Sequence, residues 1–151
     1  IMKIEEKINK SIKDSMKKKD NLRLDSLRAI KSAILIEKTK SGSKNQIDES
    51  LILKILQKMV KQRNDSAKIY LEQKRDELAN VEISQANIIS EFLPAQLSEA
   101  DLSEIIDKVI IDIGAESMKD MGKVISGVSE KVSGQAEGRL IAEIVKRKLM
   151  S

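Results

Sequence analysis

The chain has 151 residues, of which 40% are apolar and 34% charged, and a net charge of +4; these values suit one globular domain or two small ones. It contains no His and no Cys, which excludes Ser-His and Cys-His nucleophiles, disulfides and zinc sites of the usual ligand set. No apolar run approaches the roughly 18 residues of a membrane span, and we expect a cytoplasmic protein with no metal and no cofactor.

Four helices are predicted before residue 94, because the apolar residues recur every three or four positions. The second helix follows Asp20, whose carboxylate is expected to cap it. Residues 41–45 (SGSKN) predict a loop, a third helix begins at about Asp48, and a fourth ends near Leu93. The positions expected to face the core are Ile4, Ile8, Ile12 and Met16, then Leu24, Leu27, Ile30, Ile34 and Leu35, then Leu51, Ile52, Ile55, Leu56, Met59 and Val60, and finally Leu78, Val81, Ile88, Ile89 and Phe92.

Pro94 is the only proline, and the residue before a proline is pushed out of the helical region. We therefore predict an N-terminal helical domain over residues 2–93, a linker over residues 94–97 and a three-helix domain over residues 98–150. In the second domain Ser98 and Ser117 are each followed three residues later by an aspartate, a pattern typical of a helix start. The fold class is all-α: a bundle-like part of about four helices, then a small three-helix part.

Four of the six glycines lie between residues 122 and 138, which raises the question of a phosphate-binding loop. Gly122 and Gly127 have the spacing of G-x-x-x-x-G-K-[ST], but Val128 replaces the lysine and no strand is expected before them. We interpret the glycines as helix punctuation and Gly127 as a close crossing of two helices. The expected turn and hinge residues are Pro94, Gly114, Gly134 and Gly138, with Gly114 and Gly134 ending helices and Gly138 starting the last one.

Positive charge is concentrated near the N-terminus. Residues 1–46 hold 13 Lys/Arg against 6 Asp/Glu, a net +7, whereas residues 47–97 and 98–151 carry −1 and −2. Such a patch attracts polyanions, although a solvated lysine-rich surface is the alternative. Because Tyr70 and Phe92 are the only aromatic residues, any RNA would be held by its backbone and shape. The candidate RNA-binding residues are Lys10, Lys13, Lys17, Lys18, Lys19, Arg23, Arg28, Lys31, Lys123, Arg139, Lys146 and Arg147.

Several segments resemble, in order, those of the GatB/YqeY family over about residues 2–149, among them LRLDSLRAIKSAILIEK, EFLPAQLSEADL, DMGKV and SGQAEGRLIAEIVKRKL. The resemblance implies an all-helical accessory that binds tRNA, since the related part of GatB is the tail of a subunit of the tRNA-dependent amidotransferase. That tail helps to hold tRNA, while the kinase-like chemistry and glutamine hydrolysis belong to other parts of the enzyme. The family's Gly-Lys-Ala-Asp-Gly turn corresponds to residues 134–138, where Gln135 and Glu137 replace the lysine and the aspartate.

Three functions remain open from the sequence. The first is a non-catalytic, tRNA-associated module that binds RNA by backbone and shape. The second is a helical adaptor that docks on an amidotransferase, a synthetase or the ribosome. The third is an amidotransferase-like carbon–nitrogen ligase activity, with Glu91, Glu99 and Asp101 as conceivable acid–base groups. Carboxylates at helix starts are more often caps, so no catalytic residue and no small-molecule substrate are assigned.

Overall fold

The structure, a computed structural model, describes residues 2–41 and 47–151. Residues 42–45 of the predicted SGSKN loop therefore lie outside the described residues. The described residues form helices and no strand, which confirms the all-α fold class. The elements are α1 (Ile4–Lys18), α2 (Asn21–Ser41), α3 (Glu49–Glu72), α4 (Asp76–Ser90), α5 (Glu99–Ile113), the short 3₁₀ helix η1 (Met118–Asp120), α6 (Met121–Lys131) and α7 (Gly138–Met150).

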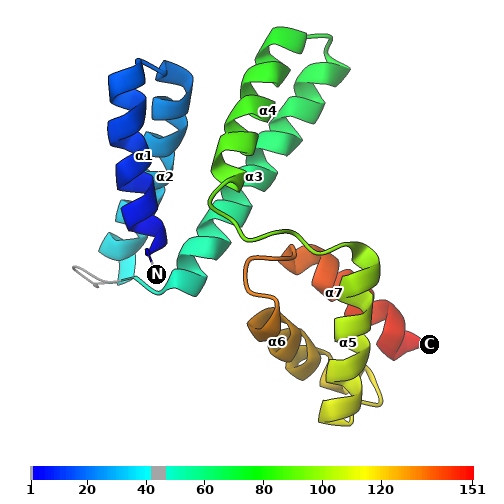
Figure 1. Ribbon diagram of the computed structural model, residues 1–151. Coiled ribbons are helices and arrows are strands. Elements are labelled where there is room, and N and C mark those ends of the chain that lie inside the picture. The colour runs from blue at the N-terminus through cyan, green and yellow to red at the C-terminus, as the bar shows by residue number, and fades with distance from the viewer. Residues whose placement is uncertain (1, 42–46) are drawn as a thin grey trace. The chain divides into compact units, whose positions relative to one another are not determined.

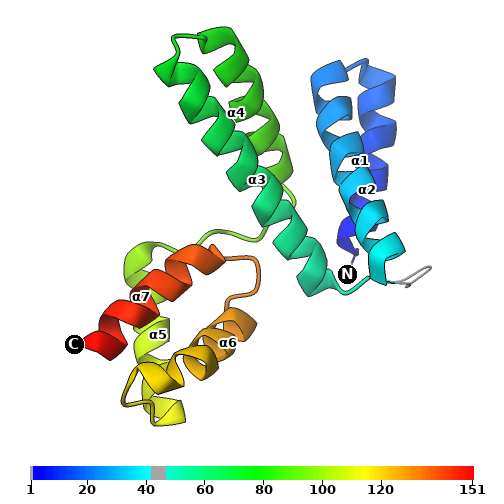
Figure 2. The same cartoon turned by 180° about the vertical axis from the view of Figure 1, so that it is seen from behind.

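The chain divides into two compact units, Ile1–Leu93 and Pro94–Ser151. The first unit consists of two antiparallel helical hairpins, α1–α2 and α3–α4 (Figures 1 and 2). Helix α2 packs on α1 and also against α3 and α4, so it joins the two hairpins. The buried core residues of this unit are Ile4, Ile8, Leu27, Ile30, Ile34, Ile52, Leu56, Met59 and Ile89.

Four residues predicted to face this core are instead exposed. Met16, Leu35, Leu78 and Val81 are 56%, 64%, 46% and 45% accessible, respectively. In α1 the buried position is Ser15, one residue earlier than expected, because a spacing of exactly four residues drifts around a helix with 3.6 residues per turn.

The α3–α4 hairpin is held together by small residues along much of its length. Ala67 of α3 and Ala79 and Ala86 of α4 are almost fully buried. Alanine lets two helix backbones approach closely and costs no side-chain entropy on burial. Leu78 and Val81 of α4 remain on the surface of this hairpin.

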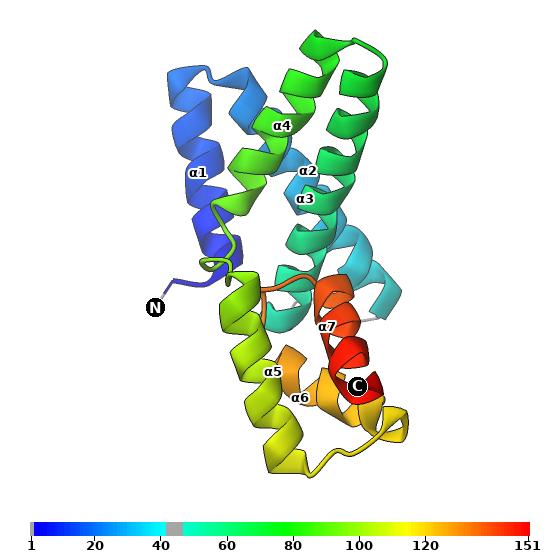
Figure 3. The same ribbon diagram turned by 90° about the vertical axis from the view of Figure 1, so that its right-hand side faces the viewer.

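The second unit is a three-helix domain in which α5, α6 and α7 all contact one another (Figure 3). The core of this unit consists mainly of branched aliphatic side chains, namely Leu102, Ile106, Val109, Val124, Val128, Val132, Ile141, Ile144, Val145 and Leu149. Gly127 lies where α6 crosses α5: a Cβ there would stand 3.1 Å from Val109 Cγ1 and 3.4 Å from Ile113 Cδ1. The predicted close crossing at Gly127 is therefore confirmed.

The helix ends of the second unit agree with those predicted from the sequence, except at the end of α6. The Ser98 hydroxyl accepts a hydrogen bond from the Asp101 amide, and Gly114 ends α5 with a left-handed φ of 73°. Helix α7 begins at Gly138, as predicted. However, α6 ends at Lys131, earlier than expected, and Gly134, with φ of 78°, lies in the turn that follows rather than at the helix end.

Residues 94–97, predicted as a linker, are bound to the turn between α6 and α7 of their own unit. The Leu97 amide donates to the Gln135 carbonyl at 2.9 Å, and the Gln96 side chain donates to the Gly134 carbonyl at 2.8 Å. The Gln135 side chain donates in return to the Ala95 carbonyl at 3.3 Å. This segment is therefore an ordered part of the second unit.

Candidate nucleic-acid interface

Three of the predicted RNA-binding lysines share the outer face of α1. Lys10, Lys13 and Lys17 are exposed, and their spacing of three and four residues places them on one side of the helix. Ile4 and Ile8 on the opposite side enter the core. The hydrophobic spacing that fixes the inner face of α1 therefore also aligns these lysines outward.

Helix α2 contributes two more cations beside α1. Arg28 and Lys31 are exposed and three residues apart, and Lys31 lines the same surface pocket as Asn9 of α1. We call the set Lys10, Lys13, Lys17, Arg28 and Lys31 the basic face. None of its members forms an ion pair with any residue in the part of the chain that the structure describes.

Half of the carboxylates of the α1–α2 hairpin are already engaged, which leaves fewer free acids than there are cations on the basic face. Glu5 pairs with Lys38 at 2.9 Å, Glu6 accepts from the Lys3 amide at the start of α1, and Asp20 Oδ1 accepts from the Arg23 amide at the start of α2. The last contact confirms the predicted Asp20 cap. Asp14 and Asp25 are exposed and follow Lys10 by four residues and precede Arg28 by three, respectively, but they are outnumbered by the cations, so the hairpin keeps a net positive surface.

Lys18 and Lys19 extend this positive charge to the turn between α1 and α2. Lys19 adopts a left-handed conformation with φ of 57°, and its amide donates to the Met16 carbonyl while the Asp20 amide donates to the Ser15 carbonyl. A left-handed residue closed by these two bonds is the usual way in which a helix ends, although glycine is the preferred residue there. Because lysine has a Cβ, its left-handed conformation at that position is strained. Its side chain places a positive charge at the tip of the hairpin.

Arg23, also predicted to bind RNA, has a structural partner. Its guanidinium donates to both carboxylate oxygens of Glu91, at 2.7 and 3.0 Å, and to the Ser11 hydroxyl at 3.1 and 3.2 Å. The hydrogen bond to Glu91 is the main reason why the pKa of Arg23 lies above its ordinary value. Arg23 thus connects α1 and α2 with the end of α4, and a phosphate would have to compete with Glu91.

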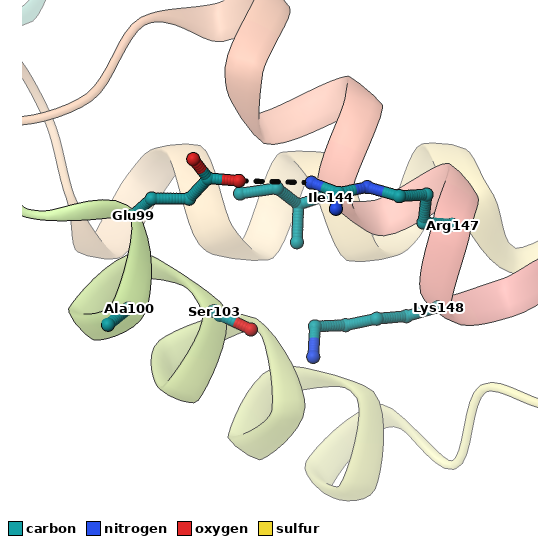
Figure 4. Close-up of a pocket in the computed structure, with 6 residues that line it drawn as sticks. All are labelled: Glu99, Ala100, Ser103, Ile144, Arg147 and Lys148. Atoms are coloured by element: carbon teal, nitrogen blue, oxygen red, sulfur yellow. Dashed lines mark hydrogen bonds and ion pairs between the residues drawn. The ribbon is translucent and has the colours of Figure 1, made fainter.

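The basic residues near the end of α7 are mostly neutralised by α5. Arg147 pairs with Glu99 at 3.1 Å, and Lys148 pairs with Asp107 at 2.7 Å. Figure 4 shows the first of these pairs spanning a pocket between the two helices, with Ser103 and Ile144 on its lining. This pocket of about 220 Å³ therefore carries paired charges and no excess of positive charge.

The remaining predicted residues of the second unit are scattered. Arg139 pairs with Glu143 of the same helix at 3.4 Å, while Lys123 and Lys146 are exposed on α6 and α7. In the turn of residues 134–138, Gln135 is bonded to Ala95, and the Glu137 side chain makes no capping hydrogen bond. The structure therefore gathers the residues around α1 and α2 into one surface and leaves these apart.

Of the conceivable catalytic carboxylates, Glu91 is bound to Arg23 and Glu99 to Arg147. Within residues 2–41 and 47–151 no group of three or more acidic residues is positioned to hold a metal ion. In the same residues no helix is both long enough and apolar enough to span a bilayer.

These features define a class: an all-helical protein of two units whose first unit presents a hairpin with a net positive surface. Residues 5–149 match the family of Yqey-like proteins, so the chain belongs to that family, as the sequence motifs indicated. Its relatives include proteins named "Altered inheritance of mitochondria protein 41, mitochondrial". The relative from Clavispora lusitaniae is 30% identical over 81% of this chain and 69% of its own length. The relative from Meyerozyma guilliermondii is 34% identical over 68% of this chain and 52% of its own length.

The names of these relatives contradict the predicted cytoplasmic location, because each describes a mitochondrial protein. That prediction is wrong. Neither the lack of a membrane-spanning run nor the lack of cysteine distinguishes the cytoplasm from another reducing compartment.

Proposed function

We propose that the chain binds structured RNA, tRNA foremost, through the basic face and the adjoining turn of the α1–α2 hairpin. The observation that carries the proposal is the contrast in charge pairing: the cations of the basic face have no carboxylate partner, whereas Arg23, Arg139 and Arg147 do. A cation that binds a phosphate releases counterions from the RNA backbone, and this release dominates nucleic-acid affinity. A cation without a carboxylate partner can do so without first breaking an ion pair. The family resemblance to a tRNA-holding tail supports tRNA as the first RNA to test.

The mode of binding follows from what the hairpin offers. Lysine ammonium groups are point charges on flexible stems that contact phosphates and carry little base selectivity. The protein would therefore follow the shape of a folded RNA, and its affinity would fall steeply with salt.

The test is a salt series of binding measurements with total tRNA, in which rRNA fragments and duplex DNA compete. A triple variant, Lys10→Gln, Lys13→Gln and Lys17→Gln, removes three charges from the basic face and preserves helix propensity. We expect an affinity loss of about tenfold or more, and a salt slope smaller by up to about three.

The matched control removes three charges from the outer side of α3 by Lys54→Gln, Lys58→Gln and Lys68→Gln. These lysines are also exposed and have no ion pair among the described residues. We expect less than a twofold change, because these lysines belong to α3 and not to the α1–α2 hairpin that carries the basic face. Equal losses in both triple variants would refute the basic face as the binding surface, and no binding at low salt would favour a protein-binding adaptor instead.

A further inference from the structure

The α1–α2 hairpin contains a small apolar pocket at the edge of the basic face. Its volume is about 110 Å³, and it is lined by Glu5, Ile8, Asn9, Lys31, Ile34, Leu35 and Lys38. Ile8 and Ile34, which are 1% and 4% accessible, belong to the core and form its floor. The pocket is therefore part of the packed hairpin, and it opens where the cations gather.

Leu35 forms an exposed apolar wall of this pocket. It is 64% accessible, although its helical position predicted a place in the core. An exposed leucine alone needs no explanation. Next to an apolar floor, however, it supplies surface that a flat apolar ligand would remove from water.

The polar groups at the mouth suit one kind of ligand. Asn9 is exposed and its side-chain amide has no hydrogen-bond partner in the described residues, so it can donate and accept at once. Lys31 has no ion pair there either and provides a positive charge for a phosphate. Glu5, the one acid in the lining, is neutralised by Lys38 at 2.9 Å.

From this combination we propose that the pocket seats one unstacked pyrimidine base of the bound RNA. A closed apolar cavity of about 150 Å³ accommodates benzene. This pocket is smaller, at about 110 Å³, but it opens to solvent, so it takes one edge of a six-membered ring while the rest of the base stays outside. Ile8 and Ile34 at the floor contact the inserted edge of the ring, and Leu35 packs on one of its faces. The Asn9 amide pairs with the polar groups of the base, and Lys31 and the basic face hold the flanking phosphates.

The inference rests on the proposed function, since it assigns a nucleotide to the edge of the same surface. It also refines the expectation from the sequence that bases are not stacked on the protein. Aliphatic walls replace the missing aromatic ones, so the gain per base falls at the lower end of what aromatic stacking gives, about fivefold in affinity.

The test compares three RNA duplexes that share one strand: a continuous duplex, one whose other strand carries a bulged uridine, and one with an abasic nucleotide in place of that uridine. The abasic bulge keeps the altered shape of the duplex and removes the base. We expect the full-length protein to bind the bulged uridine about fivefold more tightly than either of the other two RNAs.

A pair of neighbouring variants provides the control on the protein side. Leu35→Ala removes the exposed wall of the pocket, whereas Ile36→Ala removes an aliphatic side chain that is 58% accessible and does not line it. Both side chains are largely exposed, so neither change is expected to unfold the protein. We expect Leu35→Ala to abolish the preference for the bulged uridine and Ile36→Ala to retain it.

The possible failures are distinguishable. Equal, salt-dependent affinity for all three RNAs would overturn the base pocket and leave RNA binding intact. A preference that survives Leu35→Ala would also overturn the pocket, because the base would then bind elsewhere. If no RNA binds at low salt, the proposed function and this inference fail together.

Discussion

Lys19 and Lys74 adopt the left-handed conformation at helix ends, where glycine is the usual residue. Three helices end with the same pair of backbone hydrogen bonds, in which the left-handed residue is Lys19 after α1, Lys74 after α3 and Gly114 after α5. Glycine is the residue that this motif favours, because it has no Cβ to oppose a positive φ. Lys19→Gly and Lys74→Gly should therefore both stabilise the first unit.

The expected magnitude follows from two opposing effects. A left-handed conformation costs a residue with a Cβ about 1–2 kcal/mol. Glycine also stabilises the unfolded chain by about 0.4–1 kcal/mol, because its backbone has more conformational freedom there, and this opposes the gain. The net gain in the free energy of unfolding is about 0.5–1 kcal/mol for each variant, or about 2–8 °C in Tm for a unit of this size.

The chain itself provides a probe for the assay. Its only aromatic residues, Tyr70 and Phe92, both belong to the first unit. Tyrosine fluorescence during urea unfolding therefore reports the first unit, while far-UV circular dichroism reports both units. Lys19→Ala is the control variant, because it removes the same charge but keeps the Cβ and hence the strain.

The two glycine variants should differ in RNA binding although they agree in stability. Lys19 lies at the tip of the hairpin that carries the basic face, and Lys74 lies in the turn of the other hairpin. Lys19→Gly should thus gain stability and lose affinity, whereas Lys74→Gly should only gain stability. The strain argument is refuted if Lys19→Gly is no more stable than Lys19→Ala.

Three further predictions concern single positions. Ser15→Ala should stabilise the first unit by about 1 kcal/mol in tyrosine-detected unfolding, because the Ser15 hydroxyl is buried without a hydrogen-bond partner among the described residues; a loss of stability would indicate a hidden partner. Gly127→Leu should destabilise the second unit by about 1–3 kcal/mol by displacing Val109, whereas Gly122→Ala in the same helix meets no atom within 4 Å and should be neutral or slightly stabilising in unfolding followed by circular dichroism. The pKa of Asp120 is lowered by hydrogen bonds from two backbone amides, so its carboxylate stabilises the second unit at neutral pH and this contribution disappears as the pH falls below about 4; Asp120→Asn should lose stability at pH 7 and little at pH 3, and equal losses at both pH values would contradict the assignment.

Much of the fold could be predicted because it depends on local sequence. Ser98, Gly114 and Gly138 mark helix ends through bonds to residues within one turn, so their neighbours in sequence are sufficient to recognise them. The exposure of Leu35 could not be predicted in this way. Which of several aliphatic residues on a helix enters the core depends on the width of the contact with other helices, and that width is a property of the assembled unit.

In the candidate site, too, the features set by local sequence could be predicted and those set by helix packing could not. Charge density in the first 46 residues indicates the helices on which cations gather, because the outward spacing of Lys10, Lys13 and Lys17 follows from the inward spacing of the isoleucines. The pairing of Arg23 with Glu91, which is 68 residues away, could not be predicted, because an ion pair between distant segments depends on how the helices pack.

Under the proposed function, the same dependence on packing should make the two basic groups of the sequence unequal as binding surfaces. The number of basic residues in each region does not show which of them are paired with carboxylates. Packing brings Glu99 and Asp107 of α5 to the cations of α7, while the acids of the α1–α2 hairpin are partly used at helix ends and in the pair with Lys38. A phosphate approaching α7 must displace a carboxylate, and the energy recovered is then only the difference between two ion pairs. A phosphate approaching the basic face displaces only water and mobile counterions, so the affinity of the whole chain should depend on α1 and α2.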